Sequence, residues 1–276
     1  MAGQLALVGT PIGNLGDLTL RAIETLKSAD RVAAEDTRRT RALLSHLGIT
    51  GKPLVSLDAH AGERELDALL DHVAAGEQVA FVTDAGMPSV SDPGTELTRA
   101  AIARGLPVTV IPGPSAVSTA VALSGLVESA YSFVGFLPRQ GQKRRAALDA
   151  IAGRAEPVVI FEAANRTLAT LRELAERTPS RQAAVCRELT KLHEEALRGP
   201  LAELAELDRE LRGEVVIVLG AFLPEETLPS DAELDARIRE ELAAGASARD
   251  VADDLAAWSG RARREVYARV IELRRS

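Results

Sequence analysis

The sequence predicts an α/β protein made of two α/β domains and a small helical segment at the C-terminal end. Over residues 1–113, short apolar runs alternate with amphipathic stretches, and the alternation returns over residues 114–225. Over residues 1–113 this pattern is typical of strands in a mostly parallel sheet joined by covering helices, and residues 114–225 form a second α/β set. Residues 229–276 show helical patterning without a strand signal. We therefore expect an N-terminal α/β domain over 1–113, a C-terminal α/β domain over 114–225 and a helical tail over 229–276.

The first domain is expected to hold five strands with helices between them. Short apolar runs indicate the strands, which fall at 5–8, 31–34, 54–57, 79–83 and 108–111. Amphipathic stretches indicate helices at 18–28 and 63–75. A further helix is bracketed by Asp36-Thr37 at its start and Gly48 at its end. Regular structure is expected to break at Pro112-Gly113-Pro114-Ser115, and we place the domain boundary near 112–118.

The second domain continues the alternation, and the tail changes to helices alone. Strands are expected at 131–136, 158–161, 183–187 and 215–219, and helices at 116–126, 143–152, 165–177 and 201–211. In the tail, Ser247 and Asp250 resemble a capping box, and Gly260 marks a helix end. A helix, a glycine-containing turn and a helix could form a helix-turn-helix module. We favour the alternative that the tail is an appendage for packing or dimer contacts.

The composition limits the functions that the chain can have. It has 276 residues, a formal net charge of −7 and 3% aromatic residues. The negative charge argues against non-specific binding of nucleic acid over the whole surface, and the scarcity of aromatic residues argues against a surface that stacks successive bases. Local arginine-rich clusters remain compatible with both limits. A single cysteine fits a reducing cytoplasm, and the four histidines show no metal-ligand spacing, so we expect a cytoplasmic protein without a metal.

Four segments follow predicted strands of the first domain and carry the residues of a binding site. They are 9–15, 35–38, 84–94 and 112–115. The segment 84–94 reads Asp-Ala-Gly-Met-Pro-Ser-Val-Ser-Asp-Pro-Gly, which can neither extend a strand nor begin a helix cleanly. Because the carboxyl ends of parallel strands lie at one edge of a sheet, where ligands bind, these four segments should converge.

The usual nucleotide signatures are missing from the sequence. There is no Gly-x-Gly-x-x-Gly after the first strand and no Gly-x-x-x-x-Gly-Lys-Ser/Thr loop, which weakens a dehydrogenase or a P-loop interpretation. A site shaped by glycine and proline backbone, without a phosphate cradle, suits a cofactor without phosphates. S-adenosylmethionine is such a cofactor, although the spacing alone does not identify it.

Together these segments resemble a known family. The chain is similar to the tetrapyrrole methylase superfamily of S-adenosylmethionine-dependent methyltransferases and, within it, to the ribosomal RNA small-subunit methyltransferase I family. The resemblance rests on seven pieces in order: Thr10-Pro11-Ile12-Gly13-Asn14-Leu15, Ala34-Glu35-Asp36-Thr37-Arg38, the segment 84–94, Pro112-Gly113-Pro114-Ser115, Gly135-Phe136-Leu137-Pro138, Arg187-Glu188-Leu189-Thr190-Lys191 and Gly213-Glu214.

The resemblance implies a fold, a cofactor and a reaction. The fold is of tetrapyrrole-methylase type, with S-adenosylmethionine in the cleft between the two α/β domains. The reaction is methylation of a ribose 2′-hydroxyl of a cytidine in 16S ribosomal RNA, by a homodimer that acts on the assembled small subunit. Two departures stand out: Met87 replaces a usual threonine, and Phe161-Glu162-Ala163-Ala164-Asn165-Arg166 replaces a run such as Tyr-Glu-Ser.

The expected site residues fall into three groups. For the cofactor we expect Pro11, Asp84, Ala85, Gly86, Met87, Val90, Ser91, Asp92, Pro112, Ser115 and Ala116. A base or a cation that favours the alkoxide would assist the weakly nucleophilic hydroxyl, and the candidates are Glu35, Asp36, Glu188 and Lys191. Phosphate contacts suit Arg38, Arg39, Arg139, Lys143, Arg144 and Arg145. Asp36 could equally be an N-cap, and Glu188 and Lys191 a surface ion pair.

Two other functions remain open at this stage. A sister methyltransferase could act on a tetrapyrrole or on a protein side chain such as the diphthamide precursor, but the basic residues after Phe136-Leu137-Pro138 and the helical tail argue against it. A non-enzymatic nucleic-acid-binding protein could use the tail as a helix-turn-helix, but this alternative leaves the converging loops without a role.

Overall fold

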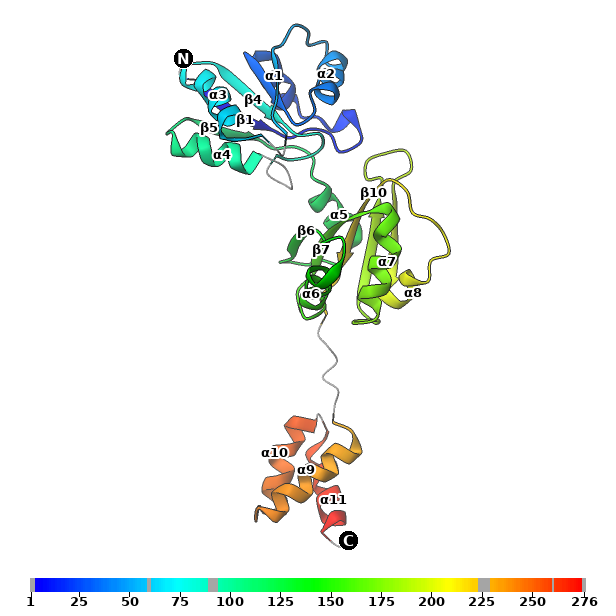
Figure 1. Ribbon diagram of the computed structural model, residues 1–276. Helices are drawn as coiled ribbons and strands as arrows, with labels where there is room; N and C mark the ends of the chain where they lie inside the picture. The colour runs from blue at the N-terminus through cyan, green and yellow to red at the C-terminus, as the bar shows by residue number, and fades with distance from the viewer. Residues whose placement is uncertain (1–2, 59–60, 89–93, 223–228, 260, 275–276) are drawn as a thin grey trace. The chain divides into compact units, whose positions relative to one another are not determined.

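The computed structural model describes residues 3–58, 61–88, 94–222, 229–259 and 261–274. The chain forms two compact units, Met1–Phe222 and Leu223–Ser276, each of which is described by itself (Figure 1). The elements of the first unit are β1 (Gln4–Val8), the 3-10 turn η1 (Leu15–Asp17), α1 (Leu20–Ser28), β2 (Arg31–Ala34), α2 (Thr37–His46), β3 (Leu54–Ser56), α3 (Glu63–Ala74), β4 (Gln78–Val82), α4 (Gly94–Ala103), β5 (Val108–Ile111), α5 (Ala116–Ser124), β6 (Ser132–Phe136), α6 (Gly141–Ala152), β7 (Val158–Ala163), α7 (Ala164–Ala175), β8 (Gln182–Arg187), β9 (Glu195–Pro200), α8 (Leu201–Ala205) and β10 (Glu214–Leu219). The second unit contains α9 (Asp231–Ala243), α10 (Ala248–Ser259) and α11 (Arg263–Leu273).

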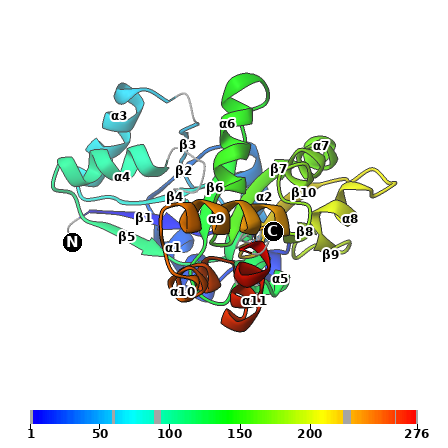
Figure 2. The ribbon, with the colours of Figure 1, turned by 90° about the horizontal axis from the view of Figure 1, so that it is seen from below.

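The first sheet is parallel and covered on both faces. Its strand order is β3-β2-β4-β1-β5, and every pairing is parallel. Helices α1 and α2 pack on one face through Leu26 and Leu44, and α3 and α4 lie side by side on the other through Leu70 and Leu97 (Figures 1 and 2). Burial on both faces explains why the strands read as unbroken apolar runs rather than as alternating patterns. The expected parallel α/β arrangement is confirmed here.

The second sheet is mixed. Its order is β6-β7-β10-β8-β9, with β6 and β7 parallel and the other pairs antiparallel. Helices α6, α7 and α8 cover one face. The other face packs against α5 and against Ile12, which comes from the loop after β1 and contacts the cluster that contains Val117, Cys186 and Leu189. A side chain of the first sheet's edge thus belongs to the core of the second sheet.

Three elements differ from the sequence predictions. Strand β9 was not predicted, because its residues lack apolar alternation and end in Gly-Pro, which only an edge strand accommodates. Helix α4 was not predicted either, because the proline- and glycine-rich segment before it obscures its start. The helix expected over 201–211 ends at Ala205, before a stretch without regular structure.

One irregularity in the second sheet affects the site directly. The pairing of β6 with β7 shifts register between Phe133 and Phe136. Gly135, which lies between them, has a φ of +67°, in the left-handed region that glycine adopts without strain. Such a bulge re-aims the side chains that follow it.

The tail folds into three helices around its own core. Leu234, Ile238, Val251, Leu255 and Val266 are buried within that core. The predicted cap at α10 is present, since the Asp250 N–H donates to the Ser247 Oγ at 3.3 Å. The predicted end signal at Gly260 lies outside the described residues. No helix in the described ranges is both long and apolar enough to cross a membrane.

Candidate functional site

The four strand-end segments of the first domain meet, as predicted. The backbones of Thr10 and Gly86 exchange two hydrogen bonds, with N···O distances of 2.9 and 3.1 Å. The Asp36 N–H donates to the Asp84 carboxylate at 3.1 Å, which ties the segment after β2 to the segment after β4. These bonds satisfy backbone groups that would otherwise lie unpaired beside a cavity.

The loops after β1 and β5 approach each other too closely for side chains. A Cβ added to Gly9 would lie 2.8 Å from the Gly113 Cα, so both positions require glycine. The Gly113 N–H donates to the Met87 Sδ at 3.2 Å. Met87 therefore supplies an acceptor, through its sulfur, to the backbone of a second loop, and this is a structural role for the residue that departs from the family pattern.

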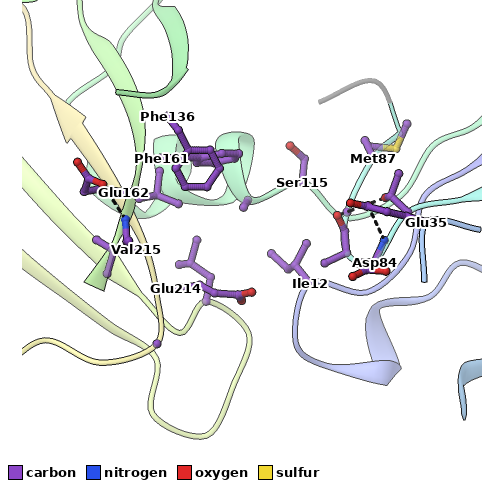
Figure 3. Close-up of a pocket in the computed structure, with 18 of the residues that line it drawn as sticks. Ile12, Glu35, Asp84, Met87, Ser115, Phe136, Phe161, Glu162, Glu214 and Val215 are labelled. Carbon is purple, nitrogen blue, oxygen red and sulfur yellow. Dashed lines mark hydrogen bonds between the residues drawn. The ribbon is translucent and has the colours of Figure 1, made fainter. Parts of the chain in front are cut away.

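A cavity of about 460 Å³ opens beside these loops, within the usual size range of ligand pockets. Figure 3 shows Ile12, Glu35, Asp84 and Met87 on one side, and Phe136, Phe161, Glu162, Glu214 and Val215 on the other, with Ser115 between them. We call the first set, together with Thr83, Ala85 and Gly86, the loop wall, and the second set, together with Ala163 and Val216, the sheet wall.

The expected cofactor residues divide into three groups by position. Asp84, Ala85, Gly86, Met87, Ser115 and Ala116 line the cavity. Pro11 instead lines a neighbouring cavity of about 300 Å³, and Pro112 is absent from the described lining of either cavity. Val90, Ser91 and Asp92 lie outside the described residues.

Of the acidic candidates in the first domain, Glu35 lines the cavity and Asp36 caps a helix. The Asp36 carboxylate accepts hydrogen bonds from the backbone N–H and from the guanidinium of Arg38, each at 2.8 Å. The side-chain hydrogen bond from Arg38, followed by the backbone one, lowers the pKa of Asp36 to about 2. A carboxylate with such a low pKa is a weak proton acceptor, which favours the N-cap role over the catalytic one.

Glu188 and Lys191 form an ion pair, but in a turn rather than in a helix. Glu188 has a φ of +50° and Thr190 a φ of +67°, so the segment curls back on itself. The Lys191 ammonium lies 3.0 Å from the Glu188 carboxylate and 2.9 Å from the carboxylate of Glu214, which lines the cavity. The two side chains thus meet through the turn, and the surface ion pair that the sequence analysis left open is present.

The protonation of this ion pair limits its chemistry. The hydrogen bond from Lys191 lowers the pKa of Glu188. Partial burial disfavours charge on Lys191, but hydrogen bonds to Glu214 and Glu188 outweigh it and raise the pKa of the lysine overall. Lys191 is thus a cation at neutral pH and can contribute charge to a reaction but not remove a proton.

The expectation that Arg144 contacts RNA is corrected by the structure. Arg144 lies on the face of α6 that also buries Leu148 and Ile151, and its side chain is 9% exposed. Its guanidinium donates to Thr170 at 2.8 Å and to the Pro138 carbonyl at 3.2 Å, and it pairs with Glu173. These partners occupy the guanidinium inside the fold, although Arg144 also borders a cavity of about 800 Å³ on that side of α6.

Arg144 belongs to a buried network that the sequence analysis missed. The Glu162 carboxylate is fully buried, accepts from the Thr170 hydroxyl at 2.7 Å, lies 3.7 Å from Arg144 and pairs with Arg166. A buried carboxylate persists only with such partners. The position of Glu162 at the end of an apolar run was the available signal, because charged residues at strand ends often face a site.

The other basic candidates lie on the surface. Arg139 and Arg145 line a cavity of about 800 Å³ with Arg166, whereas Lys143 and Arg38 are exposed. Arg39 lines the first cavity and pairs with Asp84 at 3.3 Å. No cluster of three potential metal ligands occurs within the described parts of the chain.

The fold and the site together define a class of protein. Residues 4–205 match the family model of the tetrapyrrole (corrin/porphyrin) methylases. A solved structure, the uroporphyrin-III C-methyltransferase of Thermus thermophilus complexed with S-adenyl homocysteine, superposes with a TM-score of 0.55 at 25% identity, covering 79% of this chain and 92% of that chain. The two-sheet arrangement is therefore that of a tetrapyrrole methylase.

Comparison with curated relatives specifies the branch. The ribosomal RNA small subunit methyltransferase I of Halalkalibacterium halodurans is 40% identical over 271 residues, which are 96% of this chain and 93% of that protein. The protein of the same name from Mycobacterium tuberculosis is 42% identical over 278 residues, covering 99% of this chain and 96% of the relative. The chain belongs to the ribosomal RNA small subunit methyltransferase I family of the tetrapyrrole methylases, which confirms the resemblance.

The N-cap role of Asp36 predicts a specific pH dependence of stability. Its folded pKa of about 2 lies below the ordinary value of 3.8, so its contribution is present above about pH 4 and is lost as the pH falls toward 2. The variant Asp36→Asn keeps a capping side chain without the charge. We expect the difference in free energy of unfolding between wild type and variant, from urea titrations, to shrink between pH 5 and pH 3. A difference independent of pH would contradict this role.

Proposed function

We propose that the chain transfers a methyl group from S-adenosylmethionine to the ribose 2′-hydroxyl of a cytidine in 16S ribosomal RNA of the small subunit. The relatives carry the name of a small-subunit RNA methyltransferase. The observation that carries the proposal is the acidic lining of the cavity, whose described residues contribute the carboxylates of Glu35, Asp84 and Glu214 and one arginine, Arg39, whereas the Glu162 carboxylate is buried and paired with Arg144 and Arg166.

This charge suits the cofactor. S-adenosylmethionine carries a sulfonium, an ammonium and one carboxylate and has no phosphates, so its net charge is positive and carboxylates attract it where a phosphate cradle would not. Arg39 pairs with Asp84, which leaves the loop wall without an unpaired cation among its described residues. The loop wall also presents backbone at Ala85 and Gly86, which allows a planar or polar group to approach closely.

The cofactor would be held by Asp84 to Met87 and by Ser115 and Ala116. When bound, it supplies an electrophilic methyl group. The chain's own residues then have to position the acceptor hydroxyl, exclude water and accept a proton. Of the four catalytic candidates, Glu35 lines the cavity. We therefore assign its carboxylate as the base that accepts the proton of the ribose hydroxyl. The ion pair between Lys191 and Glu214 lies at the edge of the sheet wall.

The substrate RNA would lie against basic residues outside the cavity. Arg38, Lys143 and Arg145 are exposed and Arg139 lines the second cavity, so their charges remain accessible to phosphates despite the negative charge of the whole chain. Arg39 is exposed but pairs with Asp84, and Arg144 is paired inside the fold with Glu173. We also propose that the protein is cytoplasmic, where ribosomal subunits are assembled, and that it acts as a homodimer, as the resemblance implies.

The proposed function is tested by methyl transfer from radiolabelled S-adenosylmethionine to purified small ribosomal subunits that lack the modification, with uroporphyrinogen as the competing acceptor. We expect label in 16S RNA, resistant to alkaline cleavage at one cytidine because its 2′-hydroxyl is blocked. Label in the tetrapyrrole instead would favour the sister activity. Calorimetry without heat of specific cofactor binding would favour a binding module.

If Glu35 is the base, replacing it and replacing its neighbour Asp36 should have different effects on kcat. Glu35→Gln should lower kcat by about 10²- to 10⁴-fold, the usual contribution of general base catalysis. Asp36→Asn, the adjacent control, should keep kcat near the wild-type value because its carboxylate caps α2. The measurement is single-turnover methyl transfer at saturating subunits. Equal losses in both variants would remove Glu35 as the base.

The assignment of phosphate contacts predicts a change in salt dependence. The double variant Arg139→Gln/Arg145→Gln should reduce the slope of log K for RNA binding against log salt by about 1.5, since each lost phosphate contact removes 0.7 to 0.9. Arg154→Gln removes an arginine that pairs with Glu156 at 3.2 Å and serves as the control. Cofactor binding should be unchanged in both. An unaltered slope in the double variant would refute these contacts.

A further inference from the structure

Aromatic side chains are rare in this chain, yet three of its five phenylalanines gather at one place. The ring centroids of Phe133 and Phe161 lie 4.8 Å apart in an edge-to-face arrangement, and those of Phe136 and Phe161 lie 5.5 Å apart. Both separations are in the range where aromatic rings attract each other beyond simple burial. The three rings therefore form one packed group, which we call the phenylalanine cluster.

The cluster depends on the bulge in β6. Residues three apart on a regular strand point to opposite faces, which would separate Phe133 from Phe136. The register shift between them, with Gly135 at a φ of +67°, brings both rings onto Phe161. Bulges of this kind commonly re-aim a side chain beside an active site. The backbone thus places the Phe136 ring where a regular strand would not.

The Phe136 side chain packs against Phe161 and is also exposed to the cavity. It lines the cavity together with Phe161, and Figure 3 shows the two rings next to each other in the sheet wall, across from Asp84 and Met87 of the loop wall. The Phe136 residue is nevertheless 58% exposed. Phe161 supports the ring from one side, so its other surface is free to receive a planar partner.

We propose that Phe136 stacks on the base of the nucleotide whose ribose is methylated, and so positions the acceptor hydroxyl in the cavity. This inference rests on the proposed function. A nucleotide that leaves the stack of its neighbours to place its ribose in the cavity exposes its base, which then needs a surface that replaces the lost stacking. Phe136 offers that surface for one base, in agreement with a chain too poor in aromatic residues to stack several.

The position of the ring favours the acceptor over the cofactor. The residues proposed to hold S-adenosylmethionine belong to the loop wall and to the start of α5, whereas Phe136 belongs to the opposite, sheet wall. The Glu214 carboxylate borders the same wall and is paired with Lys191, while the Glu162 carboxylate is buried. The other described residues of this wall are apolar and offer no cation to a phosphate, so the base and not the backbone of the RNA is the part that fits beside the ring.

The experiment compares Phe136→Leu, Phe136→Tyr and Phe133→Leu with wild type in methyl transfer to small ribosomal subunits. Phe136→Leu keeps apolar volume without a ring and should lower kcat/KM by about 10- to 100-fold, the range of one lost base–aromatic stack. Phe136→Tyr should restore it. Phe133→Leu is the matched control, because Phe133 packs on Phe161 but does not line the cavity, and should retain kcat/KM.

Two further readouts separate stacking from other roles of the ring. The calorimetric affinity for S-adenosylmethionine should be the same in Phe136→Leu and in wild type, and so should the mass from sedimentation equilibrium. A cofactor affinity that falls together with kcat/KM would assign the ring to the cofactor, and a changed mass would assign it to contact with a second copy. Either result overturns the proposal.

The failure of this inference is distinguishable from the failure of the proposed function. Wild-type protein that does not methylate small subunits would remove the proposed function, and the inference with it. Active wild-type protein with an equally active Phe136→Leu, or with equal losses in Phe136→Leu and Phe133→Leu, would remove the inference alone.

Discussion

The site depends on the close approach of the backbones that leave β1, β4 and β5. Gly9 and Gly113 lie too near each other for any Cβ, and Thr10 and Gly86 are joined by two hydrogen bonds. With these loops fixed, Ile12 projects from the edge of the first sheet into the core of the second. The position of the cavity between the loop wall and the sheet wall therefore follows from backbone contacts that side-chain packing alone would not determine.

The charges around the cavity are arranged in two groups with different roles. The buried carboxylate of Glu162 requires Arg166 and Arg144, so these arginines are committed to stability even though they lie beside basic surface residues. Arg145, one residue along α6, faces outward and is free of that requirement. The periodicity of the same helix thus separates a buried, structural cation, Arg144, from an exposed one, Arg145.

Much of this arrangement could be predicted from the sequence, and the exceptions have physical reasons. Apolar runs located the strands of the first sheet, and the strand-end segments met as the parallel topology requires. Arg144 was assigned to RNA because its charge was considered without the helical spacing to Leu148 and Ile151, which places it inward. The turn at Glu188, with its positive φ, and the bulge at Gly135 depend on pairing with other strands, which one sequence does not reveal. Phe136 and Phe161 were missed for that reason.

We propose that the loop wall binds the methyl donor and the sheet wall receives the acceptor nucleotide, and a crystal structure of the protein with S-adenosylhomocysteine distinguishes the two walls. We expect electron density for the ligand against Asp84 to Met87 and Ser115, with the sulfur turned toward the space in front of Phe136. Density centred on the phenylalanine cluster, or in the cavity lined by Arg139 and Arg145, would refute this division of the cavity.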